Sequence, residues 1–178
     1  MHRLFVGLRP PRAVRERLSA AMSGIAGARW QSDDQLHITL RFIGEVDRRV
    51  GEDVAHALAT VAFPPLSLRI EGVGSFDARG RVNAVWAGVR PHDEIARLHR
   101  KVDQAVVRAG LPSERRAYLP HITLARFGRG AGPVDRWLGD HAALCSAPFE
   151  VDAMILFESH LGSEGASYAA VERYPLTG

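Results

Sequence analysis

The tetrapeptide His-Ile-Thr-Leu occurs twice in this chain, at residues 37–40 and at residues 121–124. With eight histidines and four threonines, chance predicts roughly 0.2 His-x-Thr triplets, before Ile and Leu are also required. An imidazole accepts a proton when neutral and donates one when charged, because its ordinary pKa lies near ~6.5. A nearby hydroxyl can hydrogen-bond an oxygen anion. The repeat therefore predicts acid–base chemistry at an anionic group such as a phosphate, carried by His37, Thr39, His121 and Thr123.

Each copy of the tetrapeptide is typical of a β-strand, in which successive side chains point to opposite faces. His37 and Thr39 then share one face, whereas Ile38 and Leu40 point the other way, toward a core. The second copy repeats this division. If the two strands face each other, two imidazoles and two hydroxyls line one cleft. One copy in each half of the chain indicates two lobes related by a pseudo-twofold axis.

Two arginines close to the repeats are candidates for binding a phosphate, because a guanidinium is permanently charged and forms paired hydrogen bonds with phosphate oxygens. Strict alternation puts Arg41 on the same face as the first histidine and threonine. The same count puts Arg126 opposite His121, so a bulge or an end of the strand after Leu124 is needed to return it to the cleft. For Arg41, a solvated position on the strand is the alternative interpretation.

Phe5 is a candidate for stacking on a nucleobase, since every base offers a π face to an aromatic ring. It lies with Arg3, Gly7 and Arg9 on the less apolar face of the first predicted strand. Packing in the core is the alternative interpretation for this ring.

Hydrophobic spacing predicts the elements that carry these residues. Strands are expected at residues 3–9, 36–43, 66–76, 81–89, 121–127, 149–158 and 167–173. Helices are expected at residues 13–22, 47–61, 93–109 and 133–141, and residues 77–80 are expected to form a hairpin turn. Because strands and helices alternate but hairpins also occur, we expect an α+β or mixed fold rather than a doubly wound sheet.

Composition restricts the class of protein. A hydrophobic share of 46% and a charged share of 24% are typical of a soluble globular protein. Cys145 is the only cysteine, which excludes a disulfide framework and a cysteine-based zinc site. Apolar runs are too short for a membrane helix or signal peptide, so we expect a cytoplasmic protein. Arginine supplies all basic residues except Lys101. This is compatible with phosphate or nucleic acid as a partner, but a general preference for arginine over lysine is the alternative interpretation, and composition alone favours it.

The paired His-x-Thr-x motifs resemble the signature of the two-histidine phosphoesterases. The chain is most similar to the bacterial RNA 2',3'-cyclic phosphodiesterases, also called 2'-5' RNA ligase-like proteins, and residues 36–45 and 120–126 resemble the two motif regions. The resemblance implies an α+β fold of two pseudo-symmetric lobes, with antiparallel sheets around a central cleft and helices outside. We therefore expect one bilobal domain over residues 1–178.

The resemblance also implies hydrolysis of a 2',3'-cyclic phosphate at an RNA end to a 2'-phosphate, and in some members reversible 2'-5' joining of RNA ends. In that pattern His37 is the proton donor and His121 the proton acceptor, an assignment that the nearly symmetric motifs do not make themselves. Thr39 and Thr123 hold the phosphate, and Arg126 contacts it. The implied partner is RNA or an oligonucleotide with a 2',3'-cyclic phosphate end, bound without metal or organic cofactor. Two lobes in one chain favour a monomer, and the short apolar runs predict no membrane partner.

Alternatives remain at this point. The same catalysis could act on a small cyclic nucleotide or on a 2'-5' linkage. A protein of another class would bind RNA ends without turnover, although binding alone does not require two proton-transfer groups. A metal hydrolase is disfavoured, because no His-x-x-x-His or clustered carboxylate motif accompanies the repeat.

Overall fold

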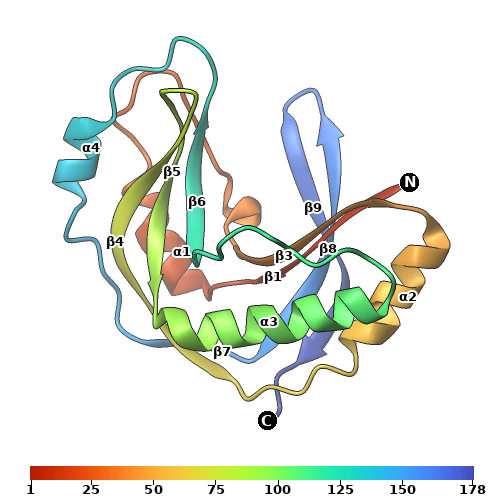
Figure 1. Ribbon diagram of the computed structural model, residues 1–178. Coiled ribbons are helices and arrows are strands. Elements are labelled where there is room, and N and C mark those ends of the chain that lie inside the picture. Colours follow the sequence, from red (N-terminus) through yellow and green to blue (C-terminus); the bar gives the residue numbers. More distant parts are fainter.

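The strands form one continuous antiparallel sheet that is divided into two halves (Figure 1). The computed structural model describes residues 1–178. The strand order is β7-β4-β5-β6-β3-β1-β8-β9, and β2 pairs with the last residues of β6. In chain order the elements are β1 (His2–Leu8), α1 (Arg12–Ser19), β2 (Ala28–Trp30), η1 (Asp33–Gln35), β3 (Ile38–Val46), α2 (Arg48–Leu58), β4 (Leu66–Ala78), β5 (Arg81–Arg90), α3 (His92–Arg108), β6 (His121–Phe127), α4 (Asp135–Asp140), β7 (Phe149–Val151), β8 (Ala153–Gly162) and β9 (Gly165–Pro175).

The division of the sheet lies between β3 and β6, which pair only through Ile38 and Ile122. We call β2, β4, β5, β6 and β7 the β6 half, and β1, β3, β8 and β9 the β3 half. In Figure 1, β4, β5 and β6 stand on one side of the molecule and β8 and β9 on the other, with α3 crossing below them. The architecture is therefore the expected bilobal α+β fold.

Buried apolar side chains from both halves join in one core on the face of the sheet that carries Ile38 and Ile122. The helix α3 presents to this core an apolar stripe of five fully buried residues: Ile95, Leu98, Val102, Ala105 and Val106. Such a stripe at helical spacing stabilises a helix mainly through tertiary packing. Because both halves share this core, we interpret residues 1–178 as a single domain. No helix is long and apolar enough to cross a membrane.

The hairpin between β4 and β5 forms where the sequence predicts it. Its turn residues Arg79 and Gly80 have φ angles of 54° and 76°. Positive φ at both central residues is the mark of a type I′ turn, whose twist matches that of paired strands. The turn therefore aligns β4 and β5 without a longer loop.

The sequence prediction differs from the structure in two places. Residues 149–158 are not one strand, because β7 pairs with β4 in the β6 half whereas β8 pairs with β1 and β9 in the β3 half. The chain thus changes halves at Asp152. The short elements β2 and η1 were not expected, since three residues give too little periodicity and β2 depends on its pairing with β6.

Candidate active site

The two His-Ile-Thr-Leu segments meet as antiparallel strands, with Ile38 of β3 paired to Ile122 of β6. Both isoleucines are fully buried, so the residues on either side of them point to the opposite face. In this register each histidine lies across from the threonine of the other strand. The four polar side chains line one cleft: His37, Thr39, His121 and Thr123. The isoleucine pair therefore marks the pseudo-twofold relation between the motifs.

Each motif strand contains a β-bulge directly at its leucine. The register of β6 with β5 skips Leu124, and the register of β3 with β1 skips Leu40. Because of the bulge, Leu124 and Ala125 are both buried, and Arg126 returns to the face of the cleft. The bulge that Arg126 needs in order to join His121 is thus present.

The bulge at Leu40 turns Arg41 into the protein, so the prediction that Arg41 faces the substrate is wrong. Arg41 touches the cleft wall but is only 7% exposed. Its Nε donates to Asp103 Oδ1 at 2.7 Å, and its two other nitrogens donate to the carbonyl oxygens of Phe42 and Pro112. With all its nitrogens occupied by the protein, Arg41 is a structural residue rather than a phosphate ligand.

The prediction that a base stacks on Phe5 is also wrong. Phe5 is 3% exposed. Its ring packs 4.8 Å from the His37 ring and 5.0 Å from the rings of both Phe157 and Tyr168, measured between centroids. The aromatic cluster fills the space behind His37 and limits the movement of the imidazole.

Phe42 is the exposed aromatic side chain of the cleft, and strict alternation along the strand did not predict it. It lines the cleft and is 51% exposed. Counted from its histidine, Phe42 occupies the position that Arg126 occupies in the second motif. Applying the bulge proposed for the second motif to the first one as well would have identified Phe42 and excluded Arg41.

Hydrogen bonds determine which nitrogen of His37 carries a proton. Its Nδ1 lies 2.6 Å from the carbonyl oxygen of Gln35, which can only accept, so Nδ1–H donates. In the neutral ring Nε2 is then free to accept from the Thr39 hydroxyl at 2.9 Å. Burial, and the positive charges of Arg126 and His121, lower the pKa of His37 to about 4. The ring is therefore neutral near pH 7 while the cleft holds no anion.

His121 is arranged in the same way but with one difference. Its Nδ1–H donates to the carbonyl oxygen of Leu119 at 2.7 Å, while its Nε2 has no hydrogen-bond partner in the protein. Burial, with a smaller effect of Arg126, lowers the pKa of His121 as well. His121 thus offers the cleft an unoccupied lone pair, which suits a general base.

The cleft has a volume of about 500 Å³ and is closed on one side by the segment that precedes β6, a size in the usual range for small-molecule sites. That segment is held by Tyr118, whose hydroxyl donates to the Thr39 carbonyl oxygen at 2.8 Å and whose ring stacks on His99 at 4.2 Å. His99 in turn donates to the Leu40 carbonyl oxygen at 2.6 Å. The connection therefore ties the two motif strands together behind the site.

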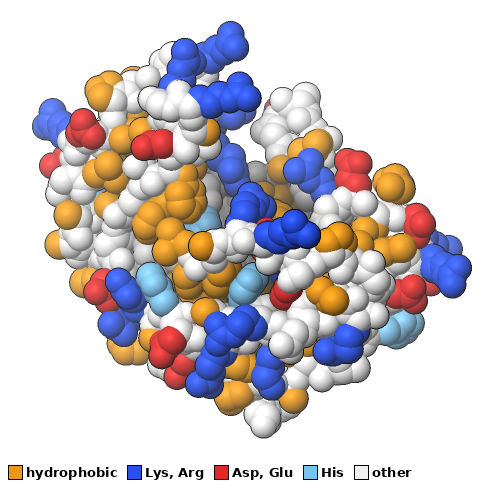
Figure 2. Space-filling view, viewed as in Figure 1, with side chains coloured by type: hydrophobic (Ala, Val, Ile, Leu, Met, Phe, Trp, Pro, Cys, Tyr) orange, Lys and Arg blue, Asp and Glu red, His pale blue; other side chains and the backbone are white.

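The arrangement combines two imidazoles, two hydroxyls and the unpaired guanidinium of Arg126 on a floor shared by β3 and β6. Figure 2 shows the hollow between the two halves, with basic side chains at its margin. No three His, Cys, Asp or Glu side chains are grouped so as to hold a metal ion. The side chains themselves can bind an anion and move protons on both sides of it.

Comparisons with known proteins show the family of the chain. Residues 10–162 match the 2'-5' RNA ligase superfamily. The RNA 2',3'-cyclic phosphodiesterase of Aeropyrum pernix is 31% identical over 160 residues, covering 88% of this chain and 90% of that protein. The protein of that name from Geobacillus stearothermophilus is 29% identical over 160 residues, covering 89% of this chain and 51% of that protein. The chain thus spans about half the length of the Geobacillus relative.

One of these findings widens the expected family. Because the Aeropyrum protein is archaeal, the similarity is not restricted to bacterial members. The crystal structure of Escherichia coli LigT complexed with 3'-AMP has the same fold, with a TM-score of 0.78, 24% identity and 99% of each chain covered. The chain therefore belongs to the 2'-5' RNA ligase superfamily.

Proposed function

We propose that this protein is a hydrolase that opens the 2',3'-cyclic phosphate at an RNA end and leaves a 2'-phosphate. The observation that carries the proposal is the pairing of Ile38 with Ile122, which brings both histidines and both threonines into one cleft. Relatives named RNA 2',3'-cyclic phosphodiesterase that are similar over most of this chain support the same reaction.

In the proposed reaction Nε2 of His121 takes a proton from a water molecule, and the water oxygen attacks phosphorus. The bond between phosphorus and O3' breaks as Nε2–H of His37 gives its proton to O3'. One water is consumed, and the products are a 2'-phosphate and a 3'-hydroxyl. The free lone pair of His121 supports its role as acceptor, which otherwise comes from the family resemblance.

His37 must carry a second proton to act as the donor, although burial lowers its pKa to about 4 in the free protein. A phosphate anion in the cleft raises this pKa, because it gives the imidazolium an opposite charge at short range. Thr39, Thr123 and Arg126 are the groups that would hold the non-bridging oxygens. Binding of the anion thus both positions the substrate and charges the acid.

A second candidate substrate is a small cyclic nucleotide, favoured by the volume of about 500 Å³. Phe42 would offer its exposed ring to the base in either case. Since both motifs come from one chain, a monomer is sufficient for the reaction. Joining of RNA ends through a 2'-5' linkage would use the same two histidines in the same roles, with a 5'-hydroxyl attacking phosphorus in place of water and O3' leaving with the proton from His37.

The test uses a short RNA that ends in a 2',3'-cyclic phosphate, with EDTA present. We expect the wild type to produce only the 2'-phosphate, and His37→Ala and His121→Ala each to lose at least about 100-fold in rate. His56→Ala is the matched control, because His56 is exposed on α2 outside the cleft. Far-UV circular dichroism checks that each variant is folded.

Three results would contradict the proposal. Full activity in either cleft variant would remove the histidines from the reaction. Formation of a 3'-phosphate would mean that the other ester bond breaks. Binding of the RNA without any product over hours would favour a protein that captures RNA ends without turnover.

A further inference from the structure

Five exposed arginines gather at the open end of the β6 half and have no partner in the protein. They are Arg29, Arg79, Arg81, Arg126 and Arg129. None of their guanidinium groups forms a salt bridge or a hydrogen bond, whereas Arg9 and Arg15 are paired with Asp33. Figure 2 shows basic side chains gathered over the tip of this half. Only Arg126 is accounted for by the chemistry of the cleft.

The stretches of chain around these arginines are poor in acidic residues, and Asp77, just before the β4–β5 turn, is an acidic residue that lines the cleft beside them. Asp and Glu are absent from residues 17–32, 78–92 and 115–134, which include β2, β5 and β6. Uncompensated charges of one sign produce a local positive potential that attracts anions, even though the net charge of the chain is only +3. The arrangement thus differs from an ordinary solvated surface, where charges of both signs alternate.

Strand pairing connects this surface with the reaction site. Arg29 of β2 and Ala84 of β5 both pair with Arg126 of β6, so the three residues form one row across the sheet. Directly paired residues point to the same face, and Arg126 and Ala84 line the cleft. Arg29 therefore extends the positive wall of the cleft by one strand.

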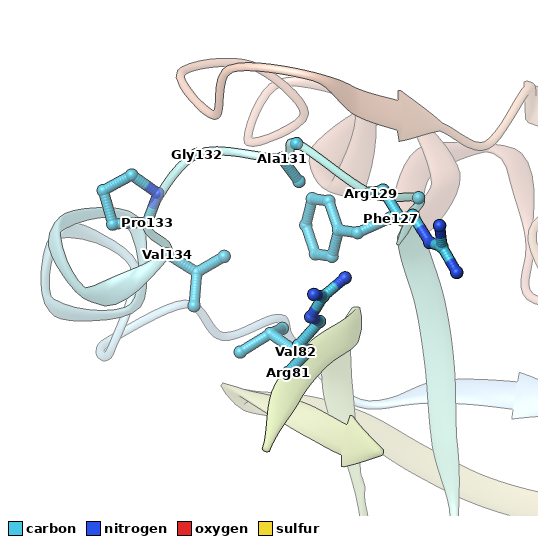
Figure 3. Close-up of a pocket in the computed structure, with 10 residues that line it drawn as sticks. Arg81, Val82, Phe127, Arg129, Ala131, Gly132, Pro133 and Val134 are labelled. Atoms are coloured by element: carbon cyan, nitrogen blue, oxygen red, sulfur yellow. The ribbon is translucent and has the colours of Figure 1, made fainter. Parts of the chain in front are cut away.

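Beyond this row, Arg81 and Arg129 border a second hollow of about 480 Å³ (Figure 3). It lies between the start of β5 and the glycine-rich segment at residues 128–132, and no carboxylate lines it. Figure 3 shows both arginines beside the ring of Phe127. Because three residues of chain reach at most about 11 Å, Arg129 stays close to Arg126.

We propose that Arg29, Arg81 and Arg129 form a track for the backbone phosphates of RNA upstream of the reacting end. The proposal rests on the proposed function, because the terminal phosphate in the cleft sets where the chain begins. An RNA strand fits the surface since it carries regularly spaced anions, whereas a cyclic mononucleotide has no further phosphate to place there. The track therefore makes the protein selective for oligonucleotide ends over cyclic mononucleotides.

The test compares the double variant Arg81→Gln/Arg129→Gln with the matched control Arg49→Gln/Arg100→Gln. The control arginines are exposed, form no ion pair and lie on α2 and α3. Fluorescence anisotropy measures the Kd of a labelled RNA pentamer with a 2'-phosphate end, between about 50 and 200 mM salt. Rates are measured with a pentamer ending in a cyclic phosphate and with adenosine 2',3'-cyclic phosphate.

Each phosphate contact on a single strand contributes about 0.7 to the slope of log K against log salt. Losing two contacts should therefore reduce the slope by about 1.4 and weaken pentamer binding about 25-fold at ~0.1 M salt. We expect a similar loss of kcat/KM with the pentamer, less than a twofold change with the mononucleotide, and no change in the control.

Two results would overturn the track. One is a double variant that binds the pentamer as tightly, and with the same salt slope, as the control. The other is a wild type that binds the pentamer no more tightly than adenosine 2'-phosphate. Failure of the proposed function is recognised separately, because it abolishes turnover of both substrates while the binding measurement still tests the track.

Discussion

Replacing Arg41 by Met should destabilise the protein strongly without removing a substrate contact. Arg41 and Asp103 form a largely buried ion pair, with side chains 7% and 15% exposed. The substitution leaves Asp103 with hydrogen bonds only from the Ser113 hydroxyl at 2.6 Å and the Glu114 amide at 3.0 Å. It also removes the donors for two backbone carbonyl oxygens.

The magnitude follows from the uncompensated groups. Removing one partner of a buried ion pair costs about 3–5 kcal/mol, which corresponds to a fall in Tm of about 10 °C for a chain of this length. Urea unfolding followed by circular dichroism measures the change. Arg126→Gln is the matched control, because Arg126 is exposed and unpaired, and its stability should change by less than about 0.5 kcal/mol.

The two substitutions should affect activity in the opposite order to stability. Arg126→Gln should lower kcat/KM about 100-fold, as loss of a donor to a developing oxyanion does, whereas folded Arg41→Met should retain most of its activity. The double variant Arg41→Met/Asp103→Leu should recover much of the stability, because an apolar pair can replace a buried ion pair. Unchanged stability in Arg41→Met, together with lost activity, would refute the structural role.

The pH dependence of the same pair has a definite sign. Burial alone raises the pKa of Asp103, but hydrogen bonds from Ser113, Arg41 and Glu114 outweigh it and hold the pKa below its usual value. A lowered pKa in the folded state stabilises the protein above the unfolded value near ~3.9. The deficit of Arg41→Met should therefore be complete above about pH 4 and shrink as the pH falls further.

Three further predictions concern the site and its support. The wild type should lose up to about 3 kcal/mol of stability as the pH falls from about 6.5 to 4, because the unfolded state binds a proton there that folded His37, with a pKa of about 4, does not bind. His37→Gln should not show this loss. Parallel urea titrations of both proteins check this, and identical pH profiles would contradict it. Gly88→Ala should destabilise the β4–β5 pair by about 2 kcal/mol, because a Cβ would lie 2.4 Å from the Glu71 carbonyl oxygen; thermal unfolding measures it, and an unchanged Tm would show that the strands adapt. Phe42→Ala should lower kcat/KM about tenfold at unchanged stability, with exposed Val171→Ala as its control, and equal rates in both variants would exclude stacking on Phe42.

Local sequence patterns were enough to predict which four polar side chains meet in the cleft and most of the elements. The repeated tetrapeptide identified four of the residues that line the cleft, because alternation on a strand separates His and Thr from Ile and Leu. The helix α3 and the β4–β5 turn were also predicted, since both depend on short-range spacing. These features depend only on residues that are close together in the sequence, so they can be predicted without the tertiary structure.

Which other side chains reach the cleft depends instead on tertiary contacts. A bulge adds one residue to a strand relative to its partner, so the position of Arg41, Phe42 and Arg126 depends on pairing with β1 and β5. The burial of Phe5 likewise depends on Phe157 and Tyr168, which arrive from the far end of the chain. Strand register and the packing of distant segments are properties of the folded molecule, and they reversed the orientation that local alternation predicted.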